Sequence, residues 1–117
     1  MRLFNTIEKQ WIDLMLGINF LGRDILRRQL TCSHIILEDK SYSNLSLILE
    51  TSSTERYLLH ESVPIIMQAY QSDGVPIEFL IHIVDGFVRE LEVYNAAGLE
   101  LQVDKITLDK LKYEVRV

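Results

Sequence analysis

The sequence predicts an α+β fold in which two N-terminal helices pack on an antiparallel meander sheet of about five to seven strands. Three observations lead to this prediction. Apolar residues recur with a helical period up to Leu30, and the period changes to two from Ser33 onward. An Asp-Gly dipeptide, Asp85-Gly86, joins two segments rich in β-forming residues. Because the helical segments precede the strand segments instead of alternating with them, the α+β class is favoured over a parallel α/β sheet.

The length and composition of the chain correspond to one domain. The chain has 117 residues, of which 48% are hydrophobic and 25% are charged, a composition typical of a globular protein that can bury its own core. No internal repeat, low-complexity segment or linker divides it, so residues 1–117 are expected to fold as a single domain. The single cysteine, Cys32, excludes an internal disulfide and is expected to be a buried thiol.

The first predicted helix covers residues 5–17. Asn5 followed by Glu8 is typical of a capping box, in which each side chain binds the other residue's backbone N–H. The residues expected to face the core are Ile7, Trp11, Leu14, Met15 and Ile18. A second helix is expected over residues 23–30, with inward residues Ile25, Leu26 and Leu30. Helices this short are marginal in water, so both are expected to dock on a flat apolar surface.

Alternating apolar residues predict the strands. Segments 34–38 and 45–50 form a hairpin around a loop rich in serine and asparagine at residues 39–44. A short edge strand is expected at residues 56–60, and another strand at 63–70, with Pro64 near its start, where a missing N–H does least harm. A C-terminal strand is expected to include residues 113–117.

The strongest local pattern is a hairpin formed by residues 77–84 and 87–94. The connecting Asp85-Gly86 favours a type I′ turn, whose twist matches that of the flanking strands. The first arm is apolar on both faces, which predicts a central strand covered by the helices on one side. In the second arm, Phe87, Leu91 and Val93 are expected to face inward. Its outward residues are expected to be Glu90, Glu92 and Tyr94.

Negative charge is concentrated near this hairpin. The net charge is −5, which argues against general affinity for nucleic-acid phosphate and favours a basic partner. Residues 73–104 contain seven acidic side chains and one basic side chain, Arg89. The hypothesis is that an acidic ridge binds the partner through Asp85, Glu90, Glu92, Tyr94 and Glu78. The alternative is an acidic face that only contacts solvent.

The sequence predicts no catalytic residues, no metal site and no cofactor. It contains no activated nucleophile, and its isolated glycines cannot form a phosphate-binding loop. His34, His60 and His82 are too far apart to bind a metal from one helical face, and His82 is interpreted as a structural residue that needs a hydrogen-bond partner. A general acid–base pair of Glu90 and Glu92 would lack a pocket and a nucleophile. The chain is therefore expected not to be an enzyme.

Several segments resemble a known family. They are Gly22-Arg23, Val63-Pro64 and residues 73–77, 80–86 and 90–94. Taken together, they are similar to small bacterial α+β immunity proteins of contact-dependent growth inhibition and polymorphic toxin systems. This resemblance implies an antitoxin that forms a 1:1 complex with a cognate basic toxin domain, often a nuclease, and blocks its active site or substrate groove. Separately, no nucleic-acid or membrane partner is expected, because the net charge is negative and no apolar stretch is long enough to span a membrane.

A cytoplasmic location is expected because charged residues interrupt the apolar N-terminal segment and no stretch is long enough to span a membrane. A second hypothesis assigns the chain to a different class. As a non-catalytic structural or adaptor module, it would associate with its own copy through the C-terminal strand, at the edge of an open sheet.

Overall fold

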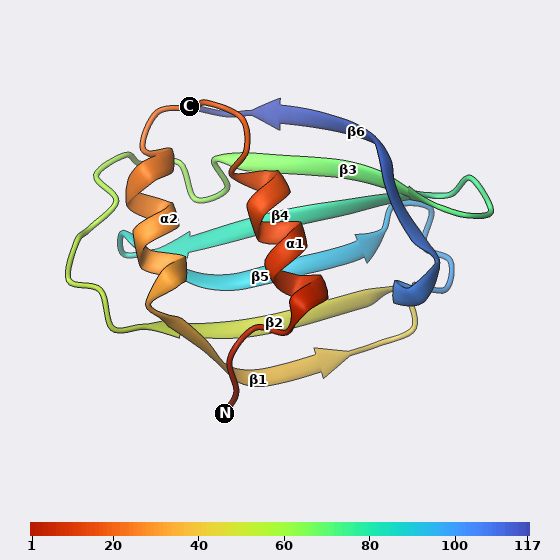
Figure 1. Cartoon of the computed structure of the whole chain (residues 1–117), viewed down its shortest axis with the longest axis horizontal. Helices are drawn as coiled ribbons and strands as arrows, with labels where there is room; N and C mark the ends of the chain where they lie inside the picture. The colour runs from red at the N-terminus through yellow and green to blue at the C-terminus, as the bar shows by residue number, and fades with distance from the viewer.

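Two helices lie on one face of a six-stranded antiparallel sheet in the computed structural model, which describes residues 1–117 (Figure 1). The helices are α1 (Thr6–Met15) and α2 (Arg23–Thr31). The strands are β1 (Ser33–Lys40), β2 (Asn44–Thr51), β3 (Ile65–Gln71), β4 (Pro76–Val84), β5 (Phe87–Asn95) and β6 (Ile106–Val115), and a 3-10 turn, η1 (Val103–Lys105), precedes β6. The predicted α+β class, with both helices before the strands, is confirmed.

The strand order is β1-β2-β5-β4-β3-β6, so β4 and β5 are central. Only β3, β4 and β5 form a meander. The β1–β2 hairpin pairs with β5. The chain after β5 then crosses to the opposite edge of the sheet, where β6 pairs with β3 (Figure 1). The strand predicted at residues 56–60 is wrong. This segment is irregular, because Tyr57 is buried beside Gly22, the N-cap residue of α2, and donates its N–H to the turn residue Gly86.

The β4–β5 hairpin has the predicted turn and one extra residue. Asp85 and Gly86 have φ values of 53° and 85°, both positive as a type I′ turn requires. Beyond the turn, the pairing shifts by one residue, which leaves Arg89 as a β-bulge. This bulge turns the apolar side chains of both arms toward the same face, because a regular two-residue hairpin would place them on opposite faces. It also corrects the prediction for Phe87: Val88 is buried in its place, and Phe87 is only partly buried.

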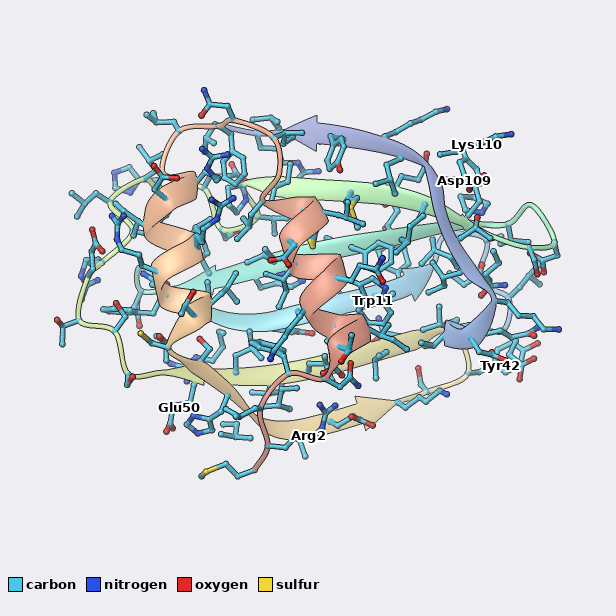
Figure 2. All side chains as sticks on the ribbon, in the orientation of Figure 1. Arg2, Trp11, Tyr42, Glu50, Asp109 and Lys110 are labelled. Carbon is cyan, nitrogen blue, oxygen red and sulfur yellow. The ribbon has the colours of Figure 1, made fainter.

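The core lies between the helices and the covered face of the sheet. Trp11 of α1 projects over the sheet in Figure 2, and its ring centroid lies 5.2 Å from that of Phe79, with an edge-on angle of 61°. The predicted inward residues Leu26 and Leu30 of α2 are buried. In contrast, the inward prediction for Ile7 is wrong, because its side chain is 51% exposed.

Glu8 takes a buried position on α1 because polar partners satisfy its carboxylate. The capping box is confirmed: Glu8 N–H donates to Asn5 Oδ1 at 2.8 Å, and Asn5 N–H donates to Glu8 Oε1 at 2.9 Å. Both terminal nitrogens of Arg2 donate to the two carboxylate oxygens at 2.7 Å. Burial raises the pKa of Glu8, but the bonds from Arg2 and Asn5 lower it more, so the pKa lies below its usual value.

A buried glutamine connects α2 to the hairpin turn. Gln29 is fully buried, and its Nε2 donates to the carbonyls of Glu55 and Gly86 at 2.7 and 2.9 Å. Its Oε1 accepts the Val88 N–H at 2.8 Å. The position of the β4–β5 turn relative to the helices is therefore fixed by a polar contact inside the core.

One further prediction is wrong, and β1 departs from regular alternation. Cys32, expected to be buried, is exposed, because it is the C-cap residue of α2 and lies outside the helix–sheet interface. In a regular strand Leu37 would share the buried face of Ile35, but it is 58% exposed, because a bulge at Ile36 turns the side chains after it to the opposite faces.

Candidate functional site

The face of the sheet opposite the helices carries the candidate site. We call it the open face and define it by the outward residues of its four inner strands, whose neighbours in sequence are buried under the helices. These residues are Asn44, Ser46 and Ile48 on β2, Glu90, Glu92 and Tyr94 on β5, Glu78, Leu80 and His82 on β4, and Ile66, Gln68 and Tyr70 on β3. The centre of the open face is polar and acidic, with apolar residues interspersed.

The structure brings four of the five predicted partner-binding residues together. Glu78, Glu90, Glu92 and Tyr94 occupy alternate positions of the two central strands, and all four are half-buried. Asp85 lies apart from them, exposed in the turn at one end of the sheet, where its carbonyl accepts a bond from the Arg56 guanidinium. The predicted ridge is thus a patch at the centre of the sheet, with Asp85 outside it.

Residues of β2 fix the carboxylates of β5. Asn44 Nδ2 donates to Glu92 Oε2 at 2.6 Å, and Ser46 Oγ donates to Glu90 Oε2. The other oxygen of Glu92, Oε1, lies 2.8 Å from His82 Nε2. The two glutamates are therefore held in defined positions by a network that spans three neighbouring strands.

Tyr94 extends the network toward Glu78. Its hydroxyl donates to Glu78 Oε2 at 2.8 Å. Burial, then this hydrogen bond, and then the negative charges of Glu78 and Glu92 raise the pKa of Tyr94 to about 12. The phenol consequently stays neutral at physiological pH and presents an aromatic ring with a fixed hydroxyl at the centre of the open face.

No lysine or arginine forms an ion pair with the carboxylates of this patch. The ion pairs of the chain join arginines to acidic residues elsewhere, including Arg2 to Glu8 and Arg28 to Glu55. His82 contacts Glu92 directly, and Arg116, just after β6, acts on Glu78 through its charge without forming an ion pair. A cation from outside the chain is therefore the natural complement of this patch.

Sequence reasoning missed the roles of His82, Asn44 and Ser46. The even spacing of residues 78, 82, 90, 92 and 94 was visible, but Glu90 lies opposite His82 only because Arg89 is a bulge. Asn44 and Ser46 reach the glutamates because β2 pairs with β5, and the periodicity of a strand does not specify its neighbour. The interpretation of His82 as a residue that needs a hydrogen-bond partner agrees with its contact to Glu92.

A groove lies on the opposite side of the molecule, away from the open face. It has a volume of about 340 Å³ and lies between the two helices and the N-terminal segment, with Phe4, Ile12 and Leu30 among its lining residues. No predicted partner-binding residue lines it. None of the described grooves is lined by Glu78, Glu90, Glu92 or Tyr94, so this part of the open face suits contact with another macromolecule better than an enclosed small ligand.

No protein-family model, curated protein or solved structure matches this chain. None of its helices has the length and apolar character needed to span a membrane. The chemistry of the open face is therefore what bears on function.

Proposed function

We propose that the open face binds a basic partner protein and that the chain is an immunity-type inhibitor of a toxin domain. It would act in the cytoplasm by binding alone, without catalysis, in a 1:1 complex that covers the active site or substrate groove of the toxin. The observation that carries this proposal is the group of three central carboxylates, Glu78, Glu90 and Glu92, which have no lysine or arginine partner in the chain.

Charge complementarity supports a nuclease as the toxin. A nuclease attracts phosphate with lysine and arginine, so an acidic protein surface can occupy the same groove. Strand residues present charge with less conformational freedom than loop residues, and here hydrogen bonds from Asn44 and Ser46 further restrict the glutamates. Tyr94 adds an aromatic ring of the type enriched at interface centres. A standard interface of about 800 Å² per partner would cover most of the open face.

The test uses a charge reversal and a matched control. Glu90→Lys with Glu92→Lys changes the open face, whereas Asp13→Lys with Glu100→Lys makes the same change in net charge at exposed positions on α1 and in the loop after β5. The partner is the toxin domain encoded by the neighbouring gene. The association rate constant is measured at low and high ionic strength, together with the protection of cells that express the toxin.

The open-face variant is expected to associate at least about tenfold more slowly at low salt, to lose most of the salt dependence of the rate, and to protect cells less. The control variant should retain most of the association rate. This result would show that the position of the charges on the open face, and not the net charge alone, sets the rate. If both variants keep the original circular dichroism spectrum and bind at the same rate as the unchanged chain, the proposed surface is wrong.

A second candidate function rests on β6. This strand pairs with β3 on one side only, so its outer backbone groups are available to another strand. A non-catalytic module that associates with its own copy would use this edge. Asp109 and Lys110 project from the bend of β6 in Figure 2 and oppose such pairing on part of its length. Sedimentation separates the two functions: a stable homodimer without a partner supports the module, and a monomer that binds the toxin domain 1:1 supports immunity.

A further inference from the structure

Three potential metal ligands converge on the open face. His82 of β4 and Glu90 and Glu92 of β5 each offer one ligand atom, and these atoms all lie within 4.8 Å of one another. None of the three residues belongs to the covered core, and all are partly accessible from the open face. An ion approaching from solvent can therefore reach all three ligand atoms.

The backbone explains why these atoms converge. Glu90 and Glu92 are two positions apart on one strand, so their side chains share a face. His82 is paired directly with Glu90 across the β4–β5 ladder. A pair of residues on one strand and a third on its neighbour give a triangular set of ligands on a rigid support. The bulge at Arg89 creates this arrangement by placing Glu90 opposite His82.

We propose that His82, Glu90 and Glu92 bind one divalent ion of the late first-row metals, with Zn²⁺ as the ion used to test the site. An imidazole nitrogen with two carboxylate oxygens suits zinc and its neighbours better than magnesium or calcium, which prefer oxygen ligands alone. Three protein ligands leave a further coordination position for water. The ion would also supply the positive charge that the central carboxylates lack.

Two neighbouring side chains support the site from outside it. Asn44 binds Oε2 of Glu92, which leaves Oε1 on the side of His82, and Ser46 binds Oε2 of Glu90. Outer hydrogen bonds of this kind orient carboxylate ligands and contribute to metal affinity. The histidine at the sheet edge lacks such a setting: His34 lies opposite one glutamate, Glu50, at 3.7 Å. The geometry thus distinguishes His82 from His34.

This inference goes beyond the proposed function, since an ion can bind the chain in the absence of any toxin. The experiment is isothermal titration calorimetry of Zn²⁺ into the purified full chain, with Co²⁺ absorption spectra as a direct measure of ligation. The ligand variants are His82→Ala, Glu90→Gln and Glu92→Gln, and the matched controls are His34→Ala and His60→Ala. Circular dichroism checks that each variant is folded, which their positions outside the core favour.

The expected result is one ion per chain with binding abolished in His82→Ala and retained in both control variants. Replacing Asn44 or Ser46 with alanine should weaken binding by about 10-fold to 100-fold. A dissociation constant weaker than about 1 mM for the unchanged chain would overturn the inference. Several ions per chain, or binding that survives in folded His82→Ala, would do the same. His82→Ala keeps both glutamates, so loss of Zn²⁺ binding with normal toxin association would leave the proposed function standing.

Discussion

The buried contact of Gln29 makes a quantitative prediction for Gln29→Leu. Leucine fills a similar volume but cannot replace the two bonds that Gln29 donates or the one that it accepts from Val88 N–H. Val88 is 1% exposed, so leaving its N–H without this acceptor should cost about 1–3 kcal/mol. The carbonyl of Gly86 keeps a bond from Tyr57 N–H at 2.8 Å, and that of exposed Glu55 can bind water, so these add about 1 kcal/mol together.

The free energy of unfolding is therefore expected to fall by about 2–4 kcal/mol, measured by urea denaturation with Trp11 fluorescence and circular dichroism. The matched control is Arg28→Ala, the adjacent residue on α2, which removes an exposed ion pair with Glu55 and should lower the stability much less, because solvent screens this pair. If Gln29→Leu costs under about 1 kcal/mol, or no more than Arg28→Ala, the buried contact does not stabilise the hairpin turn as argued.

Three further changes are predicted. Gly22→Ala should destabilise the fold by more than about 1 kcal/mol in urea denaturation, because Gly22 has a φ of 85° and a Cβ there would lie 2.4 Å from Tyr57 Cε1; an unchanged midpoint would contradict this. Arg2 and the capping bond lower the pKa of Glu8, so the stability that Glu8 contributes is present above about pH 4.3 and is lost as the pH falls further. The difference in unfolding free energy between the unchanged chain and Glu8→Gln should therefore shrink below that pH. A constant difference would refute the pairing. In ultraviolet titration, one phenol should ionise near pH 12, and this transition should be absent in Tyr94→Phe. The stability that Tyr94 contributes should be complete below about pH 10 and should be lost as the pH rises to about 12; a normal pKa for Tyr94 would contradict this.

Local patterns accounted for both helices and for most of the strands, although the strand predicted at residues 56–60 does not form and only the end of β6 was predicted. The capping box at Asn5 and Glu8 and the type I′ turn at Asp85-Gly86 depend on neighbouring residues, so the sequence alone predicts them. Alternation along each strand likewise placed Glu90, Glu92 and Tyr94 on one face. These three side chains face outward but are half-buried, because neighbouring side chains of the network on the open face cover them in part.

The rest depends on pairings between distant segments. The order of the strands and the bulges at Ile36 and Arg89 arise from the fit of one strand to another, which periodicity does not encode. The exposure of Ile7 has the same origin. Arg2 pairs with β1 through a backbone bridge and binds Glu8, so Glu8 is buried at the position where the apolar pattern predicts Ile7. A charged residue can be buried only when a partner from elsewhere in the chain is present, and a single helix does not reveal it.

The strand order also has a consequence for how the molecule folds. The β4–β5 hairpin closes through a two-residue turn and can form early, because its loop costs little entropy. Asn44 pairs with Tyr94, and β6 must return to β3, so the outer strands join through contacts between remote parts of the chain. Domains with such non-local strand pairing fold more slowly than helical bundles. We expect substitutions at Leu47 of β2 to accelerate unfolding, and those at Ile81 of β4 to slow folding, which would order the docking of β2 after the hairpin. Glu90 and Glu92 would then gain their hydrogen bonds from Ser46 and Asn44 only after the hairpin has formed, when β2 pairs with β5.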